Sequence, residues 1–195
     1  ENNPDGWAKI SLGGNSLTIF GVSKESLKPD YFHIIPNIEN TISGTKSFWG
    51  SDDDVLIGST GNDYIEGSLD ALGRTEDGAD SLEGLEGDDV LIGGPNRGAG
   101  GGWVADRYIF GDDSGDDLVI GFLFDGTGTP GEHNDILQIK PNINDSGIDS
   151  FEEVLANTAD NIDGWAVISL GSNNSITLHG VQKTDLLKRN FQFFN

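Results

Sequence analysis

Large apolar residues recur at regular spacing through the middle of the chain, and each follows a short polar stretch rich in Gly and Asp. Residues 49–57, 58–66 and 84–92 fit, in whole or in part, the pattern G-x-x-G-x-D-x-U-x, in which U is a large apolar residue. The U residue lies two places after the Asp, so both side chains point to the same face of a short strand. We expect each nine-residue unit to form a tight loop followed by a strand. Because one unit alone buries too little apolar surface to be stable, the units must stack.

The residues at position eight of each unit predict a ladder of inward-facing side chains. Successive units would alternate between the two sides of a flattened coil, so each side would receive every second unit. The expected core ladder consists of Val55 or Leu56, Ile65, Leu82, Leu91, Tyr108 and Val119.

The Gly and Asp residues of the units suggest a metal site. Gly at positions one and four permits the positive φ that a tight loop requires. Position six supplies a carboxylate, and Ca²⁺ takes about six to eight oxygen ligands from carboxylates and carbonyls. Two stacked turns can therefore hold Ca²⁺ between them, and several ions are expected in all. The predicted ligand set is Asp54, Asp63, Asp80, Asp89, Asp106 and Asp117 at position six, Asp52 at position four of the first unit, and the loop residues Gly58, Gly61, Gly84 and Gly87.

Other common metals fit the sequence less well than calcium. Magnesium demands tight octahedral geometry and retains its waters. Zinc prefers Cys and His ligands, but the chain has no Cys, and its three His residues lie outside the units without a shared ligand spacing. The absence of Cys also excludes disulfides.

The spacing of the position-six residues shows that the units are not plain nonapeptides. Asp54, Asp80 and Asp106 follow one another at intervals of 26 residues, whereas two plain units would span 18. The extra residues fall at 69–76 and within 93–102, on the side of the coil that leads to these three Asp residues. Two interpretations remain open. The insertions are either tolerated surface loops or a face that binds a ligand through Arg74, Arg97 and Trp103.

The net charge of the chain makes anionic partners unfavourable. The formal net charge is −22, from 33 Asp and Glu against 11 Lys and Arg. Such a charge argues against nucleic acid and anionic membrane surfaces as partners, and it opposes compaction unless cations neutralise it. No apolar stretch approaches the ~20 residues of a membrane span. The chain opens with Glu1-Asn2-Asn3-Pro4 and contains no Met, so we interpret it as a piece of a longer protein.

The C-terminal flank predicts ordinary secondary structure. Residues 134–139 alternate as a strand, and Ser150 with Glu153 forms a capping box that opens a short helix. Residues 165–170 and 175–178, joined by a turn, predict a β-hairpin. The last apolar residues are expected to cap the open end of the coil: Leu186, Leu187, Phe191, Phe193 and Phe194.

The N-terminal segment repeats part of this flank. Residues 5–13 match residues 163–171, and residues 16–22 match residues 175–181, so the two copies lie 158 or 159 residues apart. Residues 1–34 are therefore either the tail of a preceding tandem module, the interpretation we favour, or a second cap of the same domain. The predicted divisions are residues 1–40 for the hairpin segment, 41–125 for the coil and 126–195 for the capping region.

Residues 49–120 resemble the calcium-binding β-roll of the RTX (repeats-in-toxin) family of bacterial secreted proteins. Residues 102–110 and 114–120 resemble the usual last turns of that family, and the flank after residue 134 resembles the region that follows the roll. The resemblance implies an all-β fold, namely a parallel β-roll with loop insertions, capped by a C-terminal hairpin and strand region with one short helix. It also implies type I secretion, folding on extracellular calcium, and a secreted or cell-surface location.

The sequence departs from the family at the end of the repeats. The family often carries Asp before the Phe that follows the last repeat, but here Gly121 precedes Phe122. The sequence therefore gives no support for a terminal calcium site at Asp125 or Asp135.

Motifs for catalysis are missing from the sequence. We find no H-E-x-x-H, no G-x-S-x-G and no P-loop, so we expect a non-catalytic module whose parent protein can still be an enzyme. The leading hypothesis is a calcium-dependent module that supports export and stability of its parent. The alternative is a polysaccharide-binding or adhesive module, as in the repeat modules of alginate epimerases or in RTX adhesins, and a third hypothesis is a self-associating matrix element.

Overall fold

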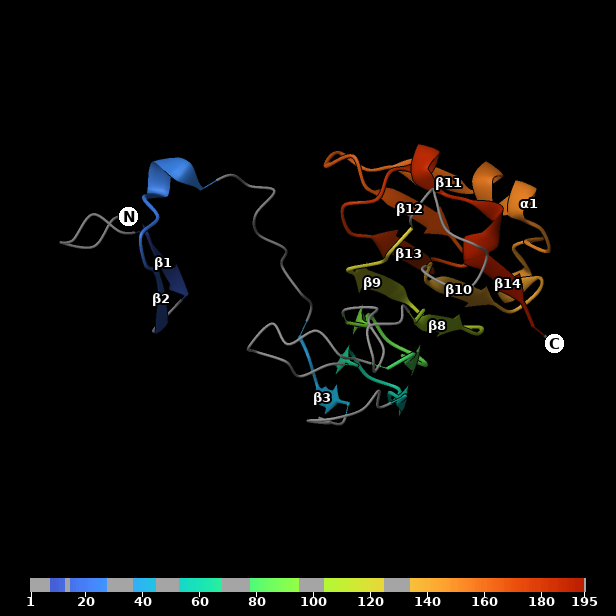
Figure 1. Cartoon of the computed structure of the whole chain (residues 1–195), viewed down its shortest axis with the longest axis horizontal. Coiled ribbons are helices and arrows are strands. Elements are labelled where there is room, and N and C mark those ends of the chain that lie inside the picture. Colours follow the sequence, from blue (N-terminus) through green and yellow to red (C-terminus); the bar gives the residue numbers. More distant parts are fainter. Residues whose placement is uncertain are drawn as a thin grey trace. The chain divides into compact units, whose positions relative to one another are not determined.

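The computed structural model describes residues 8–12, 15–27, 37–44, 53–67, 78–94, 104–124 and 134–194. It is predominantly β, most of its strand pairs are parallel, and it contains one short α-helix (Figure 1). The expected all-β class is therefore confirmed. The chain divides into two compact units, Glu1–Ile35 and Pro36–Asn195, each of which is described by itself. Within the described part of the chain, no helix has the length and apolar character needed to cross a membrane.

The first unit contains an antiparallel hairpin. Strand β1 (Ala8–Leu12) pairs with β2 (Asn15–Ile19), with Ala8 opposite Ile19. A 3-10 helix (Lys24–Ser26) follows the hairpin.

The second unit is built around two sheets. Along the chain, successive strands from β3 to β10 belong alternately to one sheet and to the other. The seven-stranded sheet has the order β11-β12-β13-β9-β7-β5-β3, and the five-stranded sheet has the order β14-β10-β8-β6-β4. The alternating strands of the seven-stranded sheet are β3 (Asn40–Ser43), β5 (Asp63–Glu66), β7 (Val90–Ile92) and β9 (Asp116–Ile120). Those of the five-stranded sheet are β4 (Val55–Ile57), β6 (Ser81–Glu83), β8 (Arg107–Phe110) and β10 (Ile136–Ile139).

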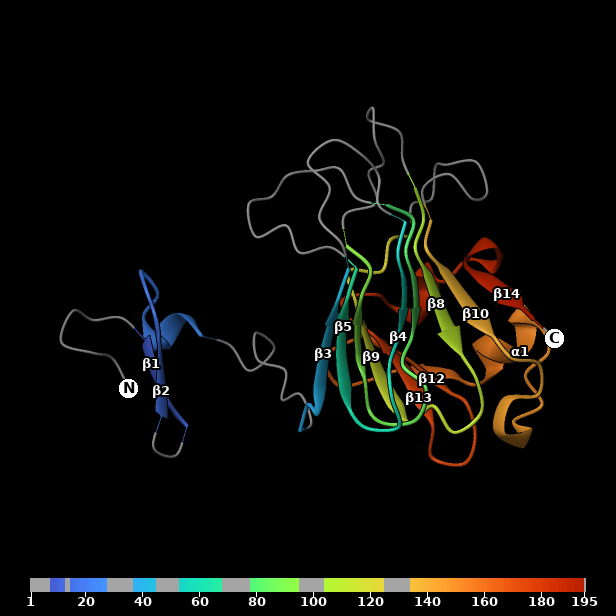
Figure 2. The same cartoon turned by 90° about the horizontal axis from the view of Figure 1, so that it is seen from below.

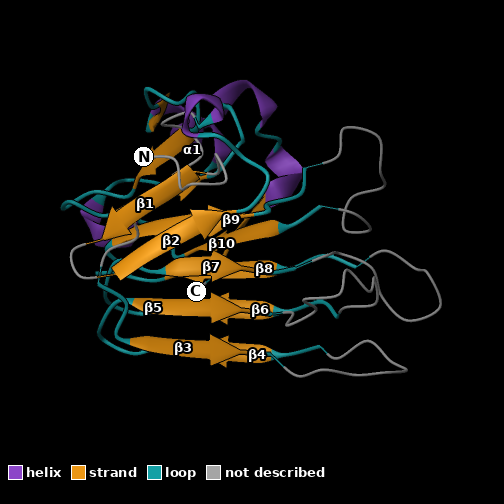
Figure 3. Cartoon of the chain, turned by 90° about the vertical axis from the view of Figure 1, so that its left-hand side faces the viewer, coloured by secondary structure: helices purple, strands orange, loops and turns teal. Residues whose placement is uncertain are grey.

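Strands β3 to β10 thus form stacked coils, each made of one strand from each sheet. Neighbours within a sheet run parallel and stack in chain order, with β3 and β4 at one end (Figures 2 and 3). In the five-stranded sheet Leu56 lies opposite Leu82, which lies opposite Tyr108. In the seven-stranded sheet Ile65 lies opposite Leu91, which lies opposite Val119. The position-eight residues of each sheet are therefore in register from coil to coil.

The predicted core ladder is confirmed. Its members Leu56, Ile65, Leu82, Leu91, Tyr108 and Val119 are all buried. The sequence left Val55 and Leu56 open as alternatives, and Leu56 is the inward residue because Val55 is 74% exposed. Since side chains alternate along a strand, the Asp at position 54 and the Leu at position 56 share one face. Burial of each such Leu or Ile contributes about 1.5–3 kcal/mol.

Residues 134–194 form what we call the closing segment, and its first strand, β10, also completes the last coil. Its elements continue both sheets: β13 pairs in parallel with β9, and β14 pairs in parallel with β10. The expected strand at β10 and the expected hairpin of β12 and β13 are confirmed. The bounds are β11 (Thr158–Asp160), β12 (Ala166–Ser169), β13 (Ser175–Leu178) and β14 (Phe191–Phe193), with 3-10 helices at Ile143–Asp145, Lys183–Asp185 and Lys188–Asn190.

The α-helix found among the described residues begins where the capping box predicts. Helix α1 (Phe151–Ala156) has Ser150 as its N-cap, and the Ser150 hydroxyl accepts a hydrogen bond from the Glu153 amide at 3.3 Å. The Glu153 carboxylate in turn accepts from the Asp149 amide at 2.7 Å. One amide of the first turn and the amide of the residue before the N-cap are thereby satisfied by side chains.

Candidate metal centre

The Asp residues at position six stand immediately before or at the start of the coil strands. We call Asp54, Asp80 and Asp106, which precede β4, β6 and β8, the first row. The second row consists of Asp63, Asp89 and Asp117, which lead into or begin β5, β7 and β9. All six except the half-buried Asp54 are buried. A buried carboxylate is costly unless it is hydrogen-bonded or paired with a cation. The additional candidate Asp52 lies outside the described residues.

One oxygen of each carboxylate joins neighbouring coils. In the first row the amide of Asp54 donates to Asp80 Oδ1 at 2.8 Å, and the amide of Asp80 donates to Asp106 Oδ1 at 2.9 Å. In the second row the amide of Asp63 donates to Asp89 Oδ1 at 2.7 Å, and the amide of Asp89 donates to Asp117 Oδ1 at 3.0 Å. Each row is thus a chain of hydrogen bonds from backbone amides to carboxylates, and these bonds fix the position of each coil relative to the next.

The first row continues to a residue that the sequence analysis set aside. The amide of Asp106 donates to Asp135 Oδ1 at 3.0 Å, and the amide of Leu123 donates to Asp135 Oδ2 at 2.8 Å. Leu137 lies opposite Tyr108 and extends the core ladder. The signal was present in the sequence, since Asp135 and Leu137 have the spacing of positions six and eight. The interval of 29 residues after Asp106 and the absence of preceding Gly at the usual places concealed it.

Side chains at position five make bonds in the opposite direction along the stack. The amide of Asp88 donates to Asn62 Oδ1 at 2.8 Å, and the amide of Asp116 donates to Asp88 Oδ1 at 2.9 Å. In the first row's coils the amide of Ala79 donates to Asp53 Oδ1 at 2.9 Å. The sequence analysis missed these residues, because the nonapeptide pattern leaves position five unspecified.

The second oxygen of five of the six position-six carboxylates, all except Asp117, lies against a Gly backbone. A Cβ atom added to Gly44 would come closer than 3.0 Å to Asp54 Oδ2 and to the carbonyl oxygen of Gly67. The same holds at Gly58, with Asp63 Oδ2 and the Gly84 carbonyl. We call these places cradles, because a carboxylate oxygen and a carbonyl oxygen of the next coil meet there in the space beside a Gly.

A third cradle repeats this geometry in the first row. At Gly67 the two atoms are Asp80 Oδ2 and the carbonyl oxygen of Gly93. At Gly84 the added Cβ would meet the carboxylate of Asp89. Oxygen atoms that converge in this way repel each other electrostatically, and a cation between them turns the repulsion into attraction. The cradle residues therefore fit an oxygen-liganded cation.

The expected reason for Gly at position one is wrong. Neither Gly58 nor Gly84 has a positive φ, and Gly61 at position four has none either. An added Cβ would clash with the Gly84 carbonyl of the next coil at Gly58 and with the Asp89 side chain of the same loop at Gly84, so packing requires Gly at both places. Gly87 does adopt a left-handed conformation, with φ of 120°, as expected for position four.

Two carboxyl groups of the second row carry perturbed pKa values. Burial, together with the neighbouring carboxylates of Asp63 and Asp88, raises the pKa of Asp89 to about 6. Burial and the Asp89 carboxylate raise the pKa of Asp117 to about 9. The Oδ2 atom of Asp89 is buried without a hydrogen-bond partner. Without a counter-charge both groups therefore hold a proton more readily than a free Asp does, and a bound cation would favour the ionised forms.

The donor set indicates which cation suits the cradles. Within the described ranges, no three His, Cys, Asp or Glu side chains converge on one point. A cation held here would take one carboxylate per coil and obtain its remaining ligands from backbone carbonyls or water. Calcium accepts such a mixed oxygen set at about 2.3–2.6 Å, whereas zinc requires nitrogen or sulfur.

The predicted ligand face lies outside the residues that the structure describes. Arg74, Arg97 and Trp103 all fall in segments that are not described, so their role stays a prediction. The connections that lead into β5, β7 and β9, in contrast, are described completely and are short.

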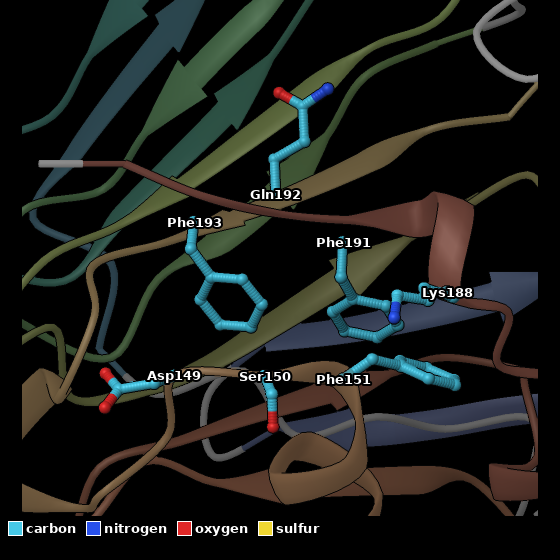
Figure 4. Close-up of a pocket in the computed structure, with 7 residues that line it drawn as sticks. All are labelled: Asp149, Ser150, Phe151, Lys188, Phe191, Gln192 and Phe193. Atoms are coloured by element: carbon cyan, nitrogen blue, oxygen red, sulfur yellow. The ribbon is translucent and has the colours of Figure 1, made fainter.

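One pocket lies in the closing segment and does not belong to the metal centre. It has a volume of about 240 Å³ and contains none of the row carboxylates (Figure 4). Phe151 and Phe191 pack against each other in its wall with ring centroids 5.3 Å apart. The lining consists of Asp149, Ser150, Phe151, Lys188, Phe191, Gln192 and Phe193.

Comparison with known proteins adds no assignment to this geometry. Neither a scan against protein-family models nor a search of the curated proteins finds a match for the chain.

Proposed function

We propose that residues 41–125 are a calcium-binding β-roll of the RTX kind and that the chain is a non-catalytic module of a larger secreted protein. The observation that carries this proposal is the convergence at Gly44, Gly58 and Gly67 of one Asp oxygen with a carbonyl oxygen from the next coil. The nonapeptide pattern and the two carboxylate rows support the same interpretation.

Calcium would act on the stability of the coil through charge. The formal net charge is −22, and the rows place several carboxylates inside the protein. The unfolded chain has no preformed cradle, so the free energy of binding becomes free energy of folding. Each site contributes about 2.7 kcal/mol when the calcium concentration is 100 times its Kd. Several such sites together can decide whether the coil folds.

This coupling supplies a role in export. In the low calcium concentration of a cytosol the carboxylate rows would repel one another, and the chain would remain extended and able to be translocated. In the higher calcium concentration outside the cell the cradles would fill and the coils would stack. The module would then stabilise the parent protein at its destination, either in the medium or at the cell surface.

A calcium titration of the full chain followed by circular dichroism tests the proposal. We expect a cooperative gain of β structure on adding calcium, its loss on adding a chelator, and no recovery with magnesium at the same concentration. Asp80→Asn removes a cradle carboxylate and is expected to raise the calcium midpoint tenfold or more. The matched control is Asp113→Asn, since Asp113 is exposed and Asn tolerates its positive φ of 60°. A chain that folds equally with calcium and with chelator contradicts the proposal.

A second candidate function rests on the unequal lengths of the coil connections. The connections into β5, β7 and β9 are short, whereas those into β6 and β8 carry the inserted residues with Arg74, Arg97 and Trp103. An enlarged face with Arg and Trp side chains suits an anionic polysaccharide or an adhesive contact. Titration with a uronate polymer in calcium distinguishes this function: binding that Trp103→Ala abolishes would support it, and no binding would leave the structural role.

A further inference from the structure

The hairpin of the first unit reproduces the closing hairpin of the second unit. In the sequence match Ile10 and Leu17 correspond to Ile168 and Ile176. Ile10 lies opposite Leu17 in the first hairpin, and Ile168 lies opposite Ile176 in the second. The neighbouring pairs agree as well, so the two hairpins share one register although their turns differ by one residue.

The likeness extends beyond the strands. The amide of Ala8 donates to the Val22 carbonyl at 2.5 Å, and the equivalent amide of Ala166 donates to the Val181 carbonyl at 2.6 Å. Gly21 and Gly180 stand at matching positions with φ of 72° and 75°. The 3-10 helix at Lys24–Ser26 matches the one at Lys183–Asp185. Residues 8–12 and 15–27 therefore adopt the same local structure as residues 166–170 and 174–186.

The two hairpins differ in what covers them. Ile176 is fully buried, whereas its counterpart Leu17 is 51% exposed. The reason is the neighbour of β13, which pairs in parallel with β9 over Ser175–Leu178. The amide of Ser175 donates to the Gly115 carbonyl at 2.9 Å, and the amide of His179 donates to the Val119 carbonyl at 2.9 Å. Strand β2, in contrast, belongs to a sheet of two described strands, β1 and β2.

We propose that the outer edge of β2 and the apolar face around Leu17 are a docking surface for the last parallel strand of a second coil. This occupant has the chemistry of β9: a short strand that follows a buried Asp and presents an apolar residue at position eight. The coil of the second unit cannot supply it, because β13 already occupies the corresponding edge of β9. In a second copy of the chain β9 is likewise covered by its own β13, so it cannot be the occupant.

The order of elements places the second coil upstream in the same polypeptide. In the second unit β9 (Asp116–Ile120) comes before the hairpin that covers it (Ala166–Leu178). The same order puts the coil that matches β1 and β2 before residue 8. The parent protein would then carry at least two modules in tandem, and the hairpin of residues 8–27 would close the earlier one.

A graft within the full chain tests this surface. Residues 163–194 are replaced by a second copy of residues 5–35, and hydrogen exchange of the β9 amides is measured in calcium. If the N-terminal hairpin is a closing hairpin, protection of Leu118, Val119 and Ile120 should stay within about tenfold of the parent chain. The matched control carries Leu17→Asp in the grafted copy alone and should lose this protection.

Two results would overturn the inference. In the first, the β9 amides of the graft exchange as fast as those of a chain ending at residue 162. In the second, the unaltered chain is a dimer by light scattering and becomes monomeric with Leu17→Asp at the native position, so that another copy covers the hairpin. A monomeric chain whose graft protects β9 supports the inference. Because the parent chain is the reference, failure of the graft is distinguishable from failure to bind calcium.

Discussion

The coil and the closing segment are stabilised in different ways. In the coil each strand from β4 to β9 buries its position-eight apolar residue, and five of the six position-six carboxylates are buried as well. The closing segment buries a larger set of apolar side chains, among them Ile143, Ile148, Val154, Ile168 and Leu170. Its one buried carboxylate, Asp135, accepts two backbone amides. The difference indicates that apolar burial sustains the closing segment, whereas under the proposed function the coil would depend on a counter-charge.

Removal of calcium should have the largest effect on stability. It should destabilise the coil much more than the closing segment. Hydrogen exchange in chelator is expected to accelerate about 100-fold or more for β5 and β7, since the loss of one site filled at 100 times its Kd costs about 2.7 kcal/mol. Exchange of β12 amides should change less than about tenfold. Equal loss of protection in both regions would contradict the comparison.

Filling one cradle with a methyl group should have the second largest effect on calcium binding. Gly67→Ala places a Cβ against Asp80 Oδ2 and the Gly93 carbonyl, and overpacking of this kind costs typically 1–3 kcal/mol or more. The calcium midpoint should rise at least tenfold. Gly111→Ala is the matched control, because Gly111 also follows a coil strand, has no positive φ, and has nothing within 4 Å of an added Cβ. Similar effects of the two substitutions on the calcium midpoint would contradict the proposal that the cradles hold calcium.

The pH dependence of the metal-free coil should show the buried carboxyl groups directly. Asp89 and Asp117 have pKa values raised from 3.8 to about 6 and about 9. The folded coil therefore binds more protons than the unfolded chain between these values and 3.8, and its stability is lost as the pH rises through about 6 and about 9. In calcium-free buffer the equilibrium should therefore shift towards the folded coil on acidification from pH 9 to pH 5, which circular dichroism would show as a gain of β structure.

Calcium should reverse the sense of this pH effect. Protons compete with the cation for the same carboxylates, so the calcium midpoint should rise as the pH falls. A metal-free chain that becomes less stable between pH 9 and pH 5 would show that the row carboxylates are not held in their buried, protonated forms.

The smallest effect is expected at the helix cap of the closing segment. Ser150→Ala removes the hydroxyl that accepts from the Glu153 amide, and loss of an N-cap costs about 1 kcal/mol. Chemical denaturation should show this loss with an unchanged calcium midpoint, because the cap lies in the segment that apolar burial sustains. A shifted calcium midpoint would mean that the stability of the closing segment and calcium binding by the coil are coupled.

Much of the fold could be predicted from local patterns in the sequence. The two-residue spacing of Asp and U identified Ile65, Leu91 and Val119 as inward residues, and the capping box located the start of α1. Asp135 escaped prediction because its approach along the chain lacks the Gly pattern, although its place in the row depends only on the stacking of β10 on β8. The sequence also could not show whether Val55 or Leu56 points inward, because this depends on which face of β4 is turned to the core.

The period, the strands, the ladder and the kinds of atom available to a cation could all be inferred from the sequence, because they follow from residue type and spacing along the chain. Only the tertiary structure decided which oxygen atoms meet. The cradles at Gly44, Gly58 and Gly67 each join residues of two coils, and the interval between coils depends on insertions that the nonapeptide pattern does not specify. The tertiary structure also decided that Ile176 is covered and Leu17 is not, since an identical local hairpin acquires its partner strand only through stacking.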